Sequence, residues 1–512
     1  MASTTTASDV HAAGETLPAH VHVAIVGTGF GGIGAAVRLL QEGFDDFVLL
    51  ERAEDLGGTW RDNSYPGCAC DVPSHLYSFS FAPNPEWTRA FSPQAEIWDY
   101  LRRVSSEYSV SERIVYGAEV RNAVWDEDSQ LWTVETARGE LTANIVIGAM
   151  GGLADPAFPE IKGLDSFTGR VFHSAQWDHD HQLEGERVAV IGTGASAIQF
   201  VPRIAADVER VDLYQRTPPW IVPKPNRELG RLRHTLYRRF PALQRLVRSA
   251  VYWRQEALVP GFVINPKLQR LVQAIAKRHL AHQVKDPVLR DKLTPRYTIG
   301  CKRILQANDY YPAVSRENVD VITDAIAEIT PGGIIDADGV HREVDTIILA
   351  TGFHVTDRPI GQRLRGVGGL TLDDVWQGSP KAYYGTTIAG FPNLFMLLGP
   401  NTGLGHSSII YMIEAQVEHI VSALKTMADN DLGAINVKAD VMETHNAELQ
   451  RRMERTVWNS GGCQSWYIDA TGRNSTLWPD FTFRFRQQVT AFDPSVYELQ
   501  PRRVDVPQPV AA

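Results

Sequence analysis

Two glycine-rich turns in the sequence could each hold the pyrophosphate of a dinucleotide. The first has the pattern G-T-G-F-G-G, contains Gly27, Gly29 and Gly32, and follows an apolar run at residues 22–26. Glycine permits a tight turn and a close approach of the backbone to a pyrophosphate, which then lies on the free amides of a helix N-terminus. Because a helical pattern follows at residues 35–40, the segment predicts a strand, a turn and a helix around a bound nucleotide.

The residue that ends the next strand indicates which nucleotide the first turn binds. The strand-like run at residues 48–50 is followed by Glu51. A carboxylate at this point accepts hydrogen bonds from a ribose 2′-hydroxyl and does not suit a 2′-phosphate. The first turn therefore predicts a site for FAD or NAD.

The second turn indicates a different nucleotide. The residues expected to lie at its phosphates are Gly192, Thr193, Gly194, Ser196 and Ala197. The strand that follows, at residues 211–214, leads to Arg216 and Thr217 instead of an acid. A guanidinium can pair with the 2′-phosphate that distinguishes NADPH from NADH. Two such sites in one chain predict a flavin that is reduced by NADPH.

The order of elements around both turns predicts an α/β protein with two Rossmann-like dinucleotide-binding domains, for FAD and NADP, and a helical insertion. A chain of 512 residues is long enough for several cores. We expect a disordered leader at 1–19, an FAD-binding domain at 20–155 and 385–492, an NADP-binding domain at 156–220 and 297–384, the helical insertion at 221–296 and a loose tail at 493–512.

The composition is that of a globular protein, with 44% hydrophobic and 21% charged residues and a net charge of −10. An acidic total argues against a nucleic-acid-binding protein, since phosphates need a basic surface. No apolar run reaches the roughly 18 residues that would predict a transmembrane helix. The cysteines Cys68, Cys70, Cys301 and Cys463 lack the spacing of a zinc site, so we expect no metal and a reducing, cytoplasmic setting.

The predicted insertion is strongly basic. Between Arg231 and Arg296 it has 15 lysine or arginine residues and only three acids, Glu256, Asp286 and Asp291. Its pattern is that of long amphipathic helices. We favour a solvated basic face on a cap subdomain over a patch that binds a membrane surface or a nucleotide.

Further motifs resemble the class B flavin-dependent monooxygenases, and specifically the Baeyer-Villiger monooxygenases. The most specific is F-x-G-x-x-x-H-x-x-x-W, formed by Phe167, Gly169, His173 and Trp177 just before the second turn. Asp178 follows it where many members of the family have proline. For His173 and Trp177 we expect hydrogen bonding and packing that couple domain movement to the position of NADPH.

A second motif of the family combines G-G-x-W, Y-P-G and an acid. In this sequence it spans residues 57–71, and the resemblance implies cofactor contacts for Thr59, Trp60 and Asp71. It also implies that Asp71 pairs with a catalytic arginine. The segment A-T-G-F at 350–353 is similar to the family's hinge back to the flavin domain.

Lys302 and Arg303 resemble the Lys-Arg segment of the same family. The resemblance implies that Lys302 contacts the NADPH 2′-phosphate and that Arg303 faces the flavin as the catalytic arginine. Trp466, which follows Ser465, resembles a cofactor-side tryptophan on a mobile loop. The segment at 401–406 either lines the flavin or substrate cavity or opens a helix.

The reaction that the resemblance implies needs a fixed cation. In this family NADPH reduces FAD, the flavin adds O2 as a C4a-peroxyflavin, and the peroxide attacks a ketone to give a tetrahedral adduct and then an ester or lactone. A peroxide anion survives only beside a fixed cation in a site kept dry. Arg303 suits this task because a guanidinium stays charged when buried, and Asp71 would orient it. An Arg–Asp pair is also, and more often, a structural salt bridge.

Other functions remain open at this point. A flavin monooxygenase that oxidises nitrogen or sulfur would share all the cofactor machinery. An NADPH-flavin electron-transfer reductase would dock an acceptor protein on the basic insertion, and a silent nucleotide-binding scaffold would bind FAD that NADPH cannot reduce. Cys68 and Cys70 suggest disulfide chemistry, but one intervening residue would strain an ordinary disulfide. The sequence leaves the ketone (linear, cyclic or aryl) and the oligomeric state undetermined.

Overall fold

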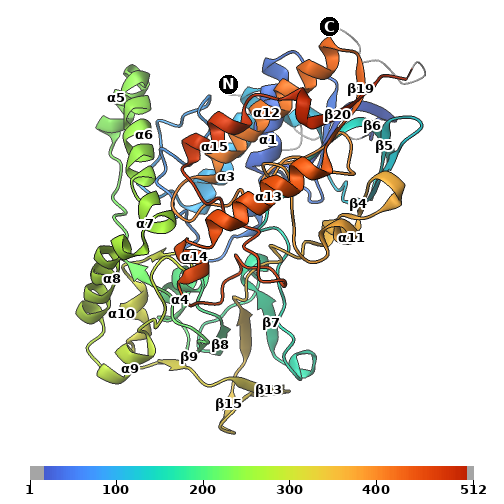
Figure 1. The fold of residues 1–512 in the computed structure, drawn as a ribbon. Helices are drawn as coiled ribbons and strands as arrows, with labels where there is room; N and C mark the ends of the chain where they lie inside the picture. Colours follow the sequence, from blue (N-terminus) through green and yellow to red (C-terminus); the bar gives the residue numbers. More distant parts are fainter. Residues whose placement is uncertain (1–15, 504–512) are drawn as a thin grey trace, which may run out of the picture.

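The computed structural model describes residues 16–503, and the two glycine-rich turns lie at the ends of strands in two different sheets (Figure 1). The strands of the first sheet are β1 (His20–Val26), β2 (Phe47–Leu50), β3 (Ile114–Val115), β4 (Val120–Asp126), β5 (Leu131–Thr136), β6 (Gly139–Gly148), β17 (Leu364–Arg365) and β18 (Leu394–Met396). Their order is β17-β4-β5-β6-β1-β2-β3, and β18 also pairs with β6. Strand β1 lies between β2 and β6 and is parallel to both.

The second sheet is parallel throughout and has the order β12-β9-β8-β16-β7. Its strands are β7 (Arg170–His173), β8 (Arg187–Ile191), β9 (Arg210–Tyr214), β12 (Val319–Ile322) and β16 (Thr346–Leu349). Beside it, β13 (Ile326–Thr330), β14 (Gly333–Asp336) and β15 (His341–Glu343) form a small antiparallel sheet. Two such sheets, each with a glycine turn after its central strand, confirm the predicted α/β fold with two Rossmann-like units.

The apolar runs of the sequence form these strands because both faces of a helix-covered parallel sheet are buried. In β1, the side chains of Val23, Ala24 and Ile25 have no exposed surface. Helix α1 (Phe30–Gln41) starts within the first glycine-rich motif, directly after Gly29, and lies against α12 (Ile409–Asp429), a helix from the C-terminal part of the chain. Both ends of the sequence therefore contribute to the first unit.

The chain returns to the first sheet earlier than the predicted bound at residue 385. Strand β17 at residues 364–365 already pairs with β4. The other helices of this part of the protein are α2 (Thr59–Asp62), α3 (Gln94–Glu107), α11 (Leu372–Trp376), α13 (Ala439–Met453), α14 (Val457–Ser460) and α15 (Thr482–Val489).

The predicted tail is structured where the structure describes it. Residues 497–501 form β20 (Tyr497–Pro501), which pairs antiparallel with β19 (Leu432–Val437). Tyr497 is buried, and this burial together with the strand pairing holds the segment against the body. The expectation of a loose tail is thus wrong for these residues. Residues 1–15 and 504–512 lie outside the described part of the chain.

The predicted insertion is helical and runs along one side of the molecule (Figure 1). Its helices are α5 (Arg231–Arg239), α6 (Pro241–Glu256), α7 (Val259–Val263), α8 (Arg270–Gln283) and α9 (Pro287–Lys292). At its base, β10 (Ile221–Val222) pairs with β11 (Leu305–Gln306), which precedes α10 (Tyr310–Val314). Among residues 16–503, no helix combines the length and apolarity needed to cross a bilayer.

Candidate active site

The first glycine turn lines a deep cleft at the carboxyl end of the first sheet. Gly27 has a φ of +102°, and a Cβ on Gly32 would lie 1.9 Å from the Gly27 carbonyl oxygen. Both positions therefore require glycine. A Cβ on Gly29 would meet only the Gly58 Cα, at 4.0 Å. The backbone at Gly29 is therefore open to the cleft, where a pyrophosphate could approach the turn.

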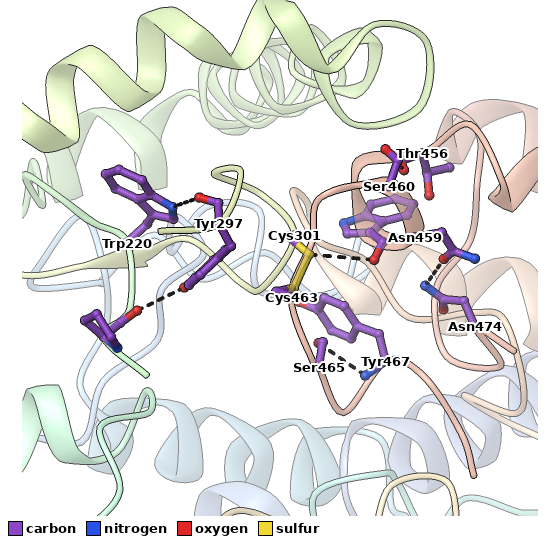
Figure 2. The surroundings of a disulfide bond; sticks show 12 residues. Trp220, Tyr297, Cys301, Thr456, Asn459, Ser460, Cys463, Ser465, Tyr467 and Asn474 are labelled. Atoms are coloured by element: carbon purple, nitrogen blue, oxygen red, sulfur yellow. Dashed lines mark hydrogen bonds between the residues drawn. A yellow bond between two sulfur atoms is a disulfide. The ribbon is translucent and has the colours of Figure 1, made fainter. Parts of the chain in front are cut away.

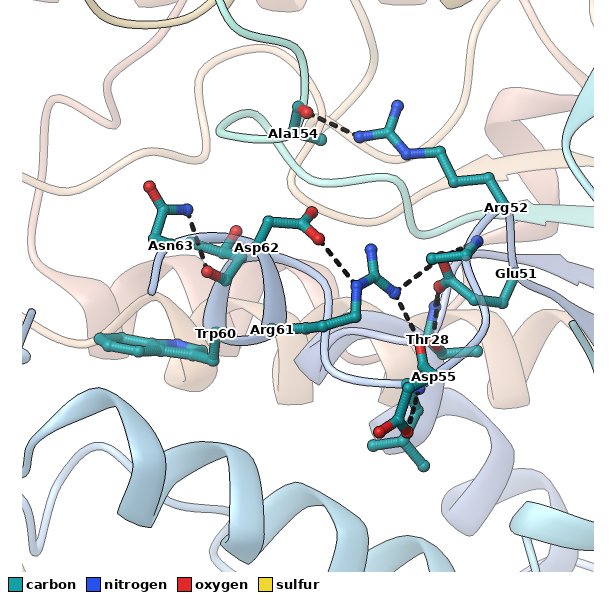
Figure 3. Close-up of polar contacts among 12 residues, drawn as sticks. Thr28, Glu51, Arg52, Asp55, Trp60, Arg61, Asp62, Asn63 and Ala154 are labelled. Carbon is teal, nitrogen blue, oxygen red and sulfur yellow. Dashed lines mark hydrogen bonds and ion pairs between the residues drawn. The ribbon is translucent and has the colours of Figure 1, made fainter. Parts of the chain in front are cut away.

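Glu51, the predicted ribose ligand, is fixed in the wall of this cleft (Figure 3). Its Oε2 accepts hydrogen bonds from the Thr28 amide, at 3.1 Å, and from the Thr28 hydroxyl. Its Oε1 accepts from the Ala53 amide at 3.0 Å and pairs with Arg61 Nη1 at 2.9 Å. Arg61 was not among the predicted residues, although it directly follows the G-G-x-W motif. The network fixes the position of the carboxylate where the sequence predicts the ribose.

Thr59 and Trp60 begin α2 and line the same cleft. Trp60 Nε1 donates to the Tyr77 hydroxyl at 3.0 Å, and the two rings lie edge to face. Arg358, a lining residue that the sequence analysis missed, donates from Nε to the Val355 carbonyl at 3.0 Å. Burial lowers the pKa of Arg358 to about 10, which still leaves a cation facing the cleft at neutral pH. A cation here suits an anionic cofactor.

The second glycine turn lies against the end of β16. Gly192 has a φ of +110°, and a Cβ there would lie 2.4 Å from the Ala350 carbonyl oxygen. A Cβ on Gly194 would meet no atom within 4 Å. Gly192 is therefore packed against backbone as Gly27 is, and the backbone at Gly194 is open as it is at Gly29.

The other predicted residues of the second turn surround the start of α4 (Ala197–Ile204). Ser196 is the residue that caps this helix, and Ala197 is its buried first residue. Thr193 is buried and donates from Oγ1 to the Thr217 carbonyl at 3.3 Å. The hydrogen bond joins the turn to the segment after β9, where Arg216 also lies.

Arg216 and Lys302 bring two positive charges together. Burial lowers the pKa of Lys302, and the Arg216 charge lowers it further. Two neighbouring cations favour the binding of an anion. The arrangement fits the 2′-phosphate of NADPH.

Arg303 and Asp71 form a bidentate ion pair, although 232 residues separate them. Arg303 Nε donates to Oδ2 at 2.5 Å and Nη2 donates to Oδ1 at 2.6 Å. Nη1 donates to the Leu404 carbonyl at 3.2 Å, so the loop at 401–408 touches this pair and also precedes α12. Of the five guanidinium N–H groups, two take no part in these bonds and can donate to a ligand.

The charges of this pair are stable. Burial pushes the pKa of Asp71 upward, but the adjacent Arg303 outweighs it and leaves the pKa lowered. The same pairing raises the pKa of Arg303 despite its burial. Tyr77, which lines the first cleft, is close enough for its pKa to respond to both groups. Lys302 directly precedes Arg303 in the chain, so the pair is adjacent to the predicted NADPH residue.

The F-x-G-x-x-x-H-x-x-x-W motif forms the edge of the second sheet. Phe167 is buried, and a Cβ on Gly169 would lie 2.2 Å from the Asp345 carbonyl oxygen. His173 ends β7, and its Nδ1 accepts from the Ala175 amide at 3.1 Å. Burial lowers the pKa of His173 to about 4, so the ring is neutral at physiological pH.

His173 and Trp177 connect this edge to other elements. The His173 ring lies 5.9 Å from the ring of Phe353, in the predicted hinge segment. The Trp177 ring lies 5.2 Å from the rings of Phe172 and Phe200. These contacts fit a packing role at the junction between the two sheets and place neither side chain at the Arg303 pair.

Comparison with known proteins adds independent evidence. Residues 24–251 match the family model described as pyridine nucleotide-disulphide oxidoreductase. The chain is 53% identical to a Baeyer-Villiger monooxygenase of Pseudomonas aeruginosa, over 94% of this chain and 92% of the relative. The chain belongs to the Baeyer-Villiger monooxygenase family. A second Baeyer-Villiger monooxygenase, from Streptomyces coelicolor, is 50% identical over 95% of this chain and 94% of the relative.

Solved structures related to this Baeyer-Villiger monooxygenase have the same fold. Cyclohexanone monooxygenase from Rhodococcus sp. Phi1, bound to NADP+, matches with a TM-score of 0.84 and 28% identity, over 95% of this chain and 100% of that chain. An oxidised steroid monooxygenase bound to NADP matches with a TM-score of 0.82 and 29% identity, over 94% and 99%. The similarity therefore extends over both nucleotide-binding units.

In this Baeyer-Villiger monooxygenase, the loop of Trp466 also contains Tyr467, a candidate site residue that the sequence analysis missed. Trp466 itself is 48% exposed and contacts the ring of Tyr467. Tyr467 is buried, and its hydroxyl has no hydrogen-bond partner among the described residues. Burial raises the pKa of Tyr467 to about 12, while the charge of Arg303 lowers it. A buried, neutral hydroxyl beside the arginine is available to a ligand.

A disulfide joins the Lys302–Arg303 segment to the Trp466 loop (Figure 2). Cys301 is fully buried and bonded to Cys463, 162 residues later. The Thr298 amide donates to the Gly461 carbonyl at 3.0 Å and adds a second tie. Three residues extend at most about 11 Å, so the bond keeps Trp466 near the arginine. Cys68 and Cys70 are free and buried, as their spacing predicts.

Replacing Cys463 with serine is expected to lower the melting temperature of the enzyme. A native disulfide typically contributes about 2–4 kcal/mol because it restricts the unfolded chain. A dithiol reductant should therefore lower the melting temperature of the unmodified protein but not that of Cys463→Ser, as followed by calorimetry. Cys68→Ser, which removes a free buried thiol, is the matched control and should keep the response to reductant. If the reductant changed the melting temperatures of all three proteins equally, the disulfide would contribute nothing to stability.

Proposed function

We propose that Arg303, oriented by Asp71, stabilises the negative charge that forms on oxygen during the reaction of this enzyme. The protein is an NADPH- and O2-dependent FAD monooxygenase that converts ketones to esters or lactones. The observation that carries the proposal is the bidentate Arg303–Asp71 pair next to Lys302, in which two guanidinium N–H groups stay available.

The residues of the two turns are proposed to hold the cofactors. Gly27, Gly29, Glu51, Thr59 and Trp60, which line the cleft, would contact FAD, and Gly32 would keep the turn tight. When bound, FAD supplies the reduced flavin at which O2 is activated. The second turn, with Arg216 and Lys302, would hold NADPH, and Trp466 would cover it from the disulfide-linked loop.

The Arg303 guanidinium is suited to two moments of the reaction. It presents fixed donors to a negatively charged oxygen, and it presents the same donors to the oxygen of a ketone carbonyl as that carbon becomes tetrahedral. Asp71 holds the guanidinium plane so that little reorganisation is needed. The buried Tyr467 hydroxyl, which has no hydrogen-bond partner among the described residues, could offer an additional donor.

A panel of linear, cyclic and aryl ketones tests the proposed function. The purified yellow enzyme is incubated with NADPH and air, and the products are identified by mass spectrometry. Esters or lactones that form only with NADPH support the proposal. Oxidation of sulfides or amines with every ketone left unchanged would instead assign the enzyme to heteroatom oxidation, and hydrogen peroxide alone would favour a reductase.

The preference for NADPH is expected to depend on Arg216 and Lys302. Each charge-assisted hydrogen bond to a phosphate contributes about 1.5–3 kcal/mol, so Arg216→Ala or Lys302→Ala should raise the KM for NADPH by roughly 10- to 100-fold. The KM for NADH, which lacks the phosphate, should change little. Arg296→Ala is the matched control, because that side chain is 82% exposed and pairs with Asp291. An equal loss with both cofactors would contradict a 2′-phosphate site.

A further inference from the structure

Helix α6 contacts the protein body with several polar side chains as well as with apolar contacts such as the stacking of Tyr252 on Tyr411. Gln244, Arg248 and Gln255 each donate to a backbone carbonyl of the protein body, at 2.6, 2.9 and 2.8 Å respectively. Glu256, at the helix end, is buried and accepts hydrogen bonds from the amide and hydroxyl of Thr482. Few polar groups of α6 are thus left for water.

The outer side of α6 is apolar. Leu246 is 66% exposed and Trp253 is 56% exposed, and the helical spacing places Leu243 beside them on the same stripe. Arg245 and Arg254 are exposed and flank this stripe on opposite sides. The outward surface of the helix therefore combines a hydrophobic strip with a cation along each edge.

Exposed apolar side chains are concentrated in this part of the protein. Of the 19 large hydrophobic side chains that are exposed within residues 16–503, 11 lie between Leu232 and Ile275. Helices α5, α6 and α8, which carry most of them, run along one side of the molecule (Figure 1). Single exposed leucines are common, but such a concentration marks an interaction surface. The insertion also exposes basic side chains such as Arg238 and Arg239, as the sequence predicts.

We propose that this face of the insertion docks on an anionic phospholipid membrane. Residues 231–296 carry a net charge of +12, and the rest of the chain accounts for −22. Leucine and tryptophan side chains can enter the boundary between headgroups and acyl chains, while the flanking arginines pair with lipid phosphates. A second copy of the same face would instead bring arginine against arginine. The chemistry of the surface therefore fits a negatively charged bilayer.

Vesicle flotation with the full-length, FAD-loaded enzyme tests the proposal without using ketone oxidation. Vesicles of phosphatidylcholine with phosphatidylglycerol are compared with vesicles of phosphatidylcholine alone. We expect the enzyme to float with the anionic vesicles. High salt should release it, because salt screens the attraction between the basic side chains and the lipid phosphates. Absence from both kinds of vesicle, or equal binding to both, would overturn the proposal.

Two double variants distinguish membrane binding by this surface from its use as a contact between two copies of the protein. Leu246→Ser combined with Trp253→Ser should weaken flotation by about tenfold or more, and Arg245→Gln combined with Arg254→Gln should reduce its salt dependence. Leu370→Ser is the matched control, since Leu370 is 53% exposed but lies outside the insertion. FAD content verifies folding of each variant. The proposal fails if the serine variant floats like the control. It also fails if the unmodified enzyme is a dimer in the absence of lipid and the serine variant is a monomer.

Discussion

Replacing Arg303 with alanine is expected to lower the rate of ester formation by about a thousandfold while NADPH still reduces the flavin. The variant loses the donors that face the reacting oxygen, and the loss of one fixed donor at a developing oxyanion typically costs 10²–10³-fold in rate. It also leaves the Asp71 carboxylate unpaired at the same place, where it would repel negative charge. Product formation and anaerobic flavin reduction, measured separately, distinguish the two steps.

A second arginine provides the control for this prediction. Arg203 pairs with Asp309 at 2.8 Å, but both side chains are about half exposed, so water screens the pair. Arg203→Ala should therefore leave both steps unchanged. If Arg303→Ala instead loses FAD, or slows reduction and oxygenation equally, the Arg303–Asp71 pair is only a structural salt bridge.

Replacing Gly32 with alanine is expected to yield protein with little bound FAD. The added Cβ would lie 1.9 Å from the Gly27 carbonyl oxygen, a backbone atom that cannot move without opening the turn. Because the pyrophosphate is proposed to lie on this turn, we expect the FAD bound per chain to fall about tenfold or more. The absorbance of the flavin relative to that of the protein measures this ratio.

Gly332→Ala is the matched control for the glycine prediction. A Cβ on Gly332 would meet no atom within 4 Å, and its φ lies outside the left-handed region. This variant should retain full flavin content. A Gly32→Ala protein that is equally yellow would show that FAD does not depend on the tight turn.

The sequence predicts the two nucleotide units because their signals are local. A β-branched run, a glycine turn and a helical pattern are adjacent in the chain, and the sheets at β1 and β8 follow from them. The pairing of Asp71 with Arg303 is different, since 232 residues separate the two. Only the resemblance to the family connected them, and the structure now gives their distances.

Other features depend on tertiary contacts that no local pattern encodes. Cys301 and Cys463 lie 162 residues apart, so their spacing contains no sign of a disulfide. Helix α6 has an amphipathic pattern in the sequence, but which side faces the protein depends on partners such as the Asn84 carbonyl. Strand β20 forms because β19 is available to pair with it, which the proline-rich sequence near Gln500 does not indicate.

Oxygenation with ¹⁸O2 tests the central claim most directly. The enzyme is supplied with NADPH, ¹⁸O2 and a ketone that it accepts, and the labelled product is counted against the NADPH consumed. We predict one ¹⁸O atom in the ester or lactone for each NADPH oxidised. Full consumption of NADPH with the ketone unchanged and all the label in hydrogen peroxide would contradict a Baeyer-Villiger reaction at Arg303.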